Sequence, residues 1–189
     1  MLSLIPFQLQ GPILATVAAI LYFVTYRFNE LFDVWFLYDQ GINLVFLPAG
    51  IKHLAILLGG PWGALGCFVS LFILANEFWQ GVPTGDIALY SLVSTCATWA
   101  GIAVCLKVLR LDRDLTNIRF IHLPLIDLFT TFLHSLTTNV FFILKGMKTD
   151  HLMTNALAMM VGDFIGSFII LTLLWLVIVY RNKQALDQS

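Results

Sequence analysis

The sequence predicts an all-α integral membrane protein, a bundle of about six transmembrane helices in a single domain over residues 1–189. Two observations predict this class. Hydrophobic residues make up 59% of the chain and charged residues only 11%, whereas a soluble domain carries roughly a quarter charged residues. The chain also contains 5 Trp and 5 Tyr, side chains that are enriched at membrane–water interfaces. The first expected partner is therefore the lipid bilayer.

Several functional classes are disfavoured by the composition. A net charge of −1 offers no basic surface for nucleic acid. The three cysteines lie in apolar segments without metal-binding spacing, and we interpret them as small packing residues. The chain has no His-Glu-x-x-His, Gly-x-Ser-x-Gly or Cys-x-x-Cys motif, so we expect neither an enzyme nor a metal site. Nothing in the sequence indicates a particular cofactor.

The spans follow from the apolar runs, because a membrane-spanning helix needs about 20 mostly apolar residues. Six candidates lie at roughly 9–26, 42–59, 61–79, 86–108, 120–144 and 153–180. The second candidate is short and carries Pro48 and Gly50. Proline removes a backbone donor and glycine loosens a helix, so we expect this helix to be broken there. The aromatic, amphipathic segment 27–41 predicts an interfacial piece.

The distribution of Lys and Arg predicts the orientation. With six spans, one side of the membrane holds six of these residues and the other side three, Lys52 excluded. The richer side carries Lys107, Arg110, Arg113, Arg119, Arg181 and Lys183, and the poorer side Arg27, Lys145 and Lys148. Both termini are therefore expected in the cytoplasm.

Ionisable residues inside the spans are candidates for a site, because each costs about 2.5–3.5 kcal/mol at membrane depth. Two readings of Lys52 stay open. Its long stem can reach the interface, or its ammonium pairs with a buried acid, Asp163 or Asp127. The candidates for a ligand site or a buried polar network are Lys52, His53, Asp127, His134 and Asp163.

The fifth span places several polar residues on one helical face. Asp127, Thr131, His134 and Thr138 follow spacings of four, three and four. The pattern suits either a polar cavity or bonding between helices. Irregular backbone at membrane depth is tolerated where it lines a cavity. Together with the expected break at Pro48, the face predicts a polar pocket between spans two, five and six.

Two blocks of the sequence resemble the bacterial membrane-associated sensor domain of the first type. The segment "FLPAGIKHLAILLGGPWGALGCFVSLFILAN" matches its first signature at Pro48, Ala49, Gly50, Gly59, Trp62, Gly63, Gly66 and Asn76. The segment "MMVGDFIGSFIILTLLW" is similar to its second block through Gly162, Asp163 and Gly166. The resemblance implies a sensor-like or accessory module of the bacterial cytoplasmic (inner) membrane, which binds a small ligand, a membrane protein partner or both. This chain departs from the pattern at Lys52 and His53, where small apolar residues are common. Residues 1–189 are also expected to form the transmembrane domain alone, without the kinase or cyclic-dinucleotide output domain that is usual in the family.

A weaker similarity points to the substrate-binding subunits of energy-coupling-factor transporters. "LLGGPWGALG" is similar to their Gly-Pro…Gly turn, and the small residues Ala15 and Ala19 offer a face for a membrane partner. This similarity implies a substrate-binding subunit of a vitamin-type transporter. A third alternative is a structural subunit of a larger membrane complex.

Overall fold

The computed structural model describes residues 7–39, 41–112, 115, 117–119, 121–147 and 151–187. The elements in order are α1 (Phe7–Glu30), α2 (Asp33–Phe36), β1 (Leu37–Asp39), β2 (Ile42–Asn43), α3 (Leu47–Phe78), α4 (Thr84–Val108), α5 (His122–Leu144) and α6 (Leu152–Asp187). Within these residues 5 helices are long and apolar enough to cross a membrane. The prediction of a helical protein is confirmed, and the short antiparallel pair β1–β2 is the exception to it.

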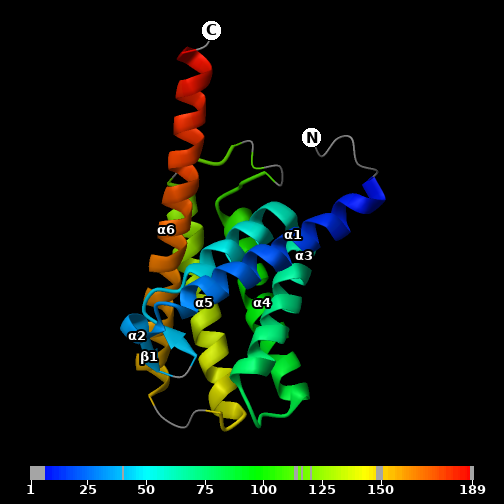
Figure 1. Cartoon of the computed structure of the whole chain (residues 1–189), viewed down its shortest axis with the longest axis vertical. Coiled ribbons are helices and arrows are strands. Elements are labelled where there is room, and N and C mark those ends of the chain that lie inside the picture. Colours follow the sequence, from blue (N-terminus) through cyan, green and yellow to red (C-terminus); the bar gives the residue numbers. More distant parts are fainter. Residues whose placement is uncertain are drawn as a thin grey trace.

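The predicted second and third spans both belong to α3, which reverses direction at Gly60. The backbone there has φ 54° and ψ −130°, a conformation that glycine adopts at little cost. A Cβ atom built on Gly63 would lie 1.9 Å from the carbonyl oxygen of Ala55, although eight residues of straight helix would separate the two by about 12 Å. The limbs 47–59 and 61–78 therefore pack against each other near the turn, where Ile51 and Ala55 contact the cluster of Cys67 and Leu71. Figure 1 shows the chain turning back between the two limbs.

The predicted break at Pro48 and Gly50 is wrong. Pro48 lies in the first turn of α3, where the missing backbone N–H would have no partner in the helix anyway. Gly50 lies inside the helix, and a Cβ atom on it would lie 2.9 Å from Cα of Ser167. The absence of a side chain thus lets α3 approach α6 closely. The proline begins a helix here and does not interrupt one.

The helices α3 to α6 form an upright bundle, and α1 runs obliquely across it against α3 (Figure 1). The start of α1 and the end of α6 lie at the same end of the molecule, and α2 with β1 lies towards the other end. Many large apolar side chains on the outside of the bundle are exposed, which is compatible with a multi-pass membrane protein. Arg113 and Lys148, which contributed to the predicted orientation, lie outside the described residues.

Two glycines of α6, Gly162 and Gly166, let a loop lie directly on this helix. A Cβ atom on Gly162 would lie 1.7 Å from the carbonyl oxygen of Asn43, and one on Gly166 would lie 2.0 Å from that of Phe46. The N–H of Phe46 donates to the carbonyl oxygen of Gly162 at 3.0 Å. These contacts fix the segment between β2 and α3 on the backbone of α6.

The small-residue face of α1 packs inside the chain. A Cβ atom on Gly66 would lie 2.1 Å from the carbonyl oxygen of Ala15, and Ser70 Oγ donates to the carbonyl oxygen of Ala19 at 2.6 Å. The face that was expected to receive a partner is therefore covered by α3. Trp62, at the start of the second limb of α3, lies over Gly11 of α1, whereas nothing lies within 4 Å of a Cβ atom on Gly59.

Candidate ligand-binding site

A pocket opens into the bundle beside the β-hairpin, and its empty space of about 760 Å³ includes open solvent outside the lining residues. Its lining forms three layers, which we call the mouth, the walls and the floor. The mouth contains Asn29, Glu30, Asp33, Gly41 and Asn43; the walls contain Tyr22, Tyr26, Phe46, Phe78, Trp79 and Tyr90; and the floor contains Lys52, Ser94, His134 and Asp163.

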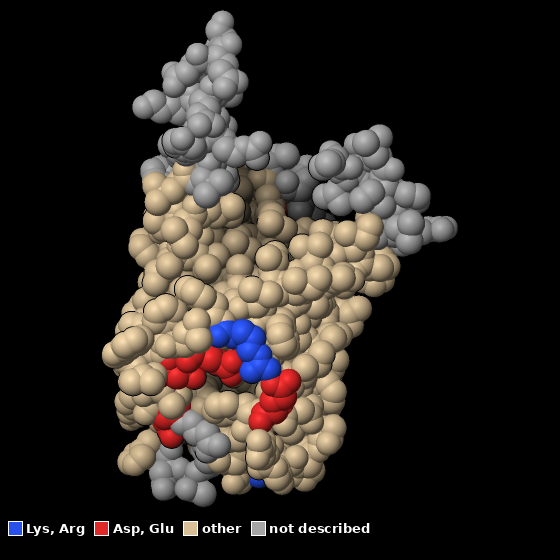
Figure 2. All heavy atoms as spheres, viewed as in Figure 1, with Lys and Arg blue, Asp and Glu red and all other residues tan. Residues whose placement is uncertain are grey.

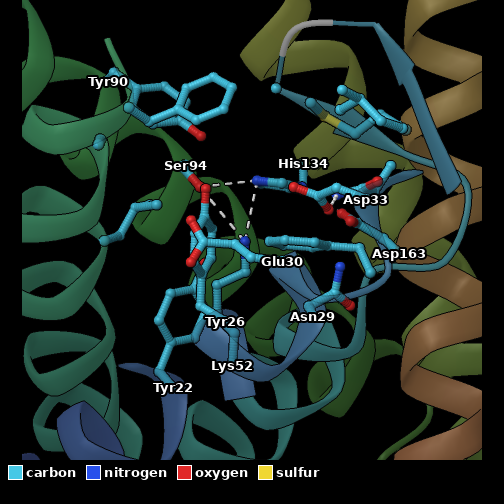
Figure 3. A pocket seen from close by; sticks show the side chains of 18 of the residues that line it. Tyr22, Tyr26, Asn29, Glu30, Asp33, Lys52, Tyr90, Ser94, His134 and Asp163 are labelled. Carbon is cyan, nitrogen blue, oxygen red and sulfur yellow. Dashed lines mark hydrogen bonds and ion pairs between the residues drawn. The ribbon is translucent and has the colours of Figure 1, made fainter. Parts of the chain in front are cut away.

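The floor is a hydrogen-bonded cluster in which four helices meet (Figure 3). Lys52 Nζ from α3 lies 3.1 Å from His134 Nε2 on α5 and 3.4 Å from Ser94 Oγ on α4. Ser94 Oγ also lies 2.8 Å from His134 Nε2. On the other side of the imidazole ring, His134 Nδ1 lies 2.8 Å from Asp163 Oδ2 on α6. With Asp163 ionised, Nδ1–H donates to the carboxylate and Nε2 accepts from Lys52 or Ser94.

Lys52 follows neither of the two readings of the sequence. Lys52 is only 1% exposed, so its ammonium group does not reach the membrane interface. Among the described residues no ion pair joins it directly to a carboxylate, since Asp163 lies across the ring of His134. An ammonium has three N–H donors, and the described residues supply two acceptors for it. One donor is thus left for a group inside the pocket.

His53 and Asp127 form a second polar cluster, separate from the floor. His53 Nδ1 contacts Asp127 Oδ1, and Ser167 Oγ lies 3.3 Å from the same nitrogen. Both residues line a smaller cavity, together with Leu57, Ile102 and Leu123 towards the other end of the bundle. His53 Nε2 and Asp127 Oδ2 are buried without a partner in the described part of the chain. Such atoms beside a cavity are typical positions for an ordered water.

The polar face of α5 therefore serves two clusters. Asp127, Thr131, His134 and Thr138 are all buried, but Asp127 pairs with His53 while His134 lies on the pocket floor. The expectation of one cavity shared by Asp127 and His134 is not met. The pocket also extends beyond the expected helices, because α1, α2 and α4 contribute to its lining.

The sequence interpretation missed Ser94 and the mouth. Ser94 belongs to a stripe on α4 whose spacing was a usable signal, since four hydroxyl residues fall on one buried face: Ser91, Ser94, Thr95 and Thr98. The mouth residues Asn29, Glu30 and Asp33 lie in the segment 27–41, which was interpreted as interfacial. Only the arrangement of α1 against α3 shows that they surround a cavity.

The mouth carries an excess of negative charge. Figure 2 shows most of the charged side chains on this face gathered around a hollow. Arg27 pairs with Glu30 at 3.0 Å and also with Glu77. Asp33 Oδ1 accepts a hydrogen bond from Asn43 Nδ2 at 2.9 Å. The guanidinium of Arg27 and the three carboxylates together have a net charge of −2; the carboxylates are those of Glu30, Asp33 and Glu77.

The hydrogen bonds from Ser94 through His134 to Asp163 have the order of a serine hydrolase triad. Two features make this cluster unsuitable for that chemistry. The ammonium of Lys52 competes with Ser94 for the single lone pair of His134 Nε2. Ser94 also lies in the middle of α4, where the backbone N–H groups are bonded within the helix and cannot form an oxyanion hole. The cluster therefore lacks the arrangement that a serine hydrolase triad requires.

Among the described residues no group of three or more His, Cys, Asp or Glu side chains is placed to hold a metal ion. No family model, no curated protein and no solved structure matches this chain.

Proposed function

We propose that this protein is a sensor-like or accessory membrane module that binds a small organic ligand in the pocket above Lys52. One observation carries the proposal. A pocket leads from the surface of the bundle to a buried ammonium that has a donor to spare. A buried charge is costly at membrane depth, and a ligand acceptor on the free N–H would complete its hydrogen bonding.

The shape and lining of the pocket support binding over a purely structural role. A cluster that only joined helices would need neither an opening nor walls. Here the walls are aromatic, and a few polar groups converge at the floor, which is the usual composition of a small-molecule site. With both ends of the chain in the cytoplasm of a bacterium, the mouth would face the outside of the inner membrane. A ligand from that side would then bias contacts with a membrane partner.

The test is purification of the full chain in nanodiscs, followed by mass spectrometry of the small molecules that remain bound. We expect one compound to copurify with the native chain and to be lost in Lys52→Met. The matched control is Lys145→Met, because Lys145 pairs with Asp86 at 2.7 Å and does not line the pocket. A compound retained equally in both variants, or none in the native chain, would overturn the proposal.

The same pocket suits a second function, the substrate-binding subunit of a transporter. The observation that favours it is that the pocket encloses its polar floor and would hold a solute at the surface of the bundle. The two functions differ in consequence. A transporter subunit predicts uptake of the solute that depends on an ATPase partner, and a sensor-like module predicts none. Uptake of the copurified compound into cells, lost in Lys52→Met, would decide for transport.

A further inference from the structure

We infer that the ligand is a small organic cation, with an N–H-bearing ammonium at the mouth, an apolar body between the walls and a hydrogen-bond acceptor at the floor. This inference rests on the proposed function and adds the chemical class of the ligand. It is carried by three features of the pocket, one in each layer.

The first feature is the charge at the mouth. The pairing of Arg27 with Glu30 and Glu77 leaves one carboxylate in excess, and Asp33 adds another. A hollow lined by one sign of charge between low-dielectric walls concentrates ions of the opposite sign. The mouth therefore favours the entry of cations and repels anions.

The second feature is an unused acceptor at the mouth. Asn43 donates its Nδ2–H to Asp33 Oδ1 at 2.9 Å, which directs the amide oxygen away from that carboxylate. Asn43 Oδ1 is buried and has no partner in the described part of the chain. A buried acceptor costs about 1–3 kcal/mol when it is left unpaired, and an ammonium N–H would satisfy it. Asn43 and Asp33 together thus offer a neutral and a charged acceptor to one ammonium.

The third feature is the contrast between the walls and the floor. Aromatic rings attract cations and also bury an apolar body, and the walls supply Tyr and Trp rings between the two ends. The ammonium of Lys52 excludes a second cation from the floor, but its free N–H suits a hydroxyl or carbonyl oxygen. The ligand is therefore oriented, with its positive end outward.

The experiment uses three probes of similar size on the full chain in nanodiscs. Tyramine has an ammonium and a phenol oxygen, phenethylamine has only the ammonium, and 3-(4-hydroxyphenyl)propionate has the phenol and a negative charge. We expect tyramine to raise the melting temperature most, phenethylamine less and the propionate not at all.

Two variants separate the mouth from the floor. Asp33→Asn should weaken the apparent affinity for both amines about tenfold, the scale of one lost hydrogen bond to a charge. Lys52→Met should remove the advantage of tyramine over phenethylamine. Asp86→Asn is the control for charge removal, because Asp86 pairs with Lys145 outside the pocket.

The outcomes distinguish this inference from the function on which it rests. A stronger response to the propionate than to the amines, or a copurifying ligand with a net negative charge, would overturn the cation while leaving ligand binding intact. The absence of both a copurifying compound and any probe response would overturn both.

Discussion

The imidazole ring of His134 lies between Lys52 and Asp163, 3.1 Å from the ammonium through Nε2 and 2.8 Å from the carboxylate through Nδ1. The two opposite charges therefore act on each other across a polarisable ring and not in direct contact. Removal of either end leaves the other buried and uncompensated, which is the costly situation for an ion in a dry interior.

Asp163→Asn tests this relationship. The amide keeps the shape of the side chain and can still accept from His134, but it removes the charge that compensates Lys52. We expect the free energy of unfolding to fall by about 3–5 kcal/mol, the cost of breaking a buried pair, and the bound ligand to be lost. The measurement is unfolding in mixed detergent micelles, with Asp86→Asn as the surface control. Unchanged stability would mean that the carboxylate is not charged in the folded protein.

Gly60→Ala tests the reversal of α3. A Cβ atom in this backbone conformation costs about 1–3 kcal/mol, so we expect a loss of that size in the free energy of unfolding. Gly59→Ala is the matched control, because the space around its Cβ is open and its φ is not positive. Equal effects of the two substitutions would contradict a reversal at Gly60.

Gly162→Ala tests the contact between α6 and the loop that carries Asn43. The new Cβ atom would lie 1.7 Å from the carbonyl oxygen of Asn43, so the loop must move away from the helix. We expect a loss of about 1–3 kcal/mol in stability, as for other overpacked sites, and weaker ligand retention because Asn43 moves with the loop. Gly85→Ala in α4 meets open space and should change neither quantity.

A double-mutant cycle on His53 and Asp127 tests the second cluster. Replacement of each by Asn, singly and together, should show a coupling free energy of about 0.5–3 kcal/mol, as for residues in contact. The exposed pair of Lys145 and Asp86 serves as the comparison, and surface pairs of this kind typically couple by 0.2–1 kcal/mol. Additive effects at His53 and Asp127 would show that their contact contributes nothing to stability.

The helical class was predictable from the sequence because apolar runs of spanning length have few other solutions. The position of the helix break was not predictable from the sequence, because Pro48 suits both the interior of a broken helix and the first turn of a new one. Only the β-hairpin before it, which ends at Asn43, shows that α3 begins at Leu47. The sequence predicted that one span ends at residue 59 and the next begins at residue 61. In the structure both belong to α3, whose backbone turns back tightly at Gly60.

The candidate residues were predictable in type but not in pairing. Asp127 and His134 share a helical face, yet they lie two turns apart, about 10 Å along the axis. Each therefore takes its partner from another helix, and the sequence contains no direct record of which helices pack together. Ser94 was missed for the same reason, because its hydrogen-bond partners lie on two other helices, α3 and α5.

Lys52 and His53 are consecutive, but they belong to the two clusters that face opposite ends of the bundle. Neighbouring positions on a helix point about 100° apart, so a single turn of α3 forms the partition between the clusters. A rotation of that turn to accommodate a group at Lys52 must also change the contact of His53 with Asp127. The pocket and the second polar cluster therefore share one helical turn of α3 as their common wall.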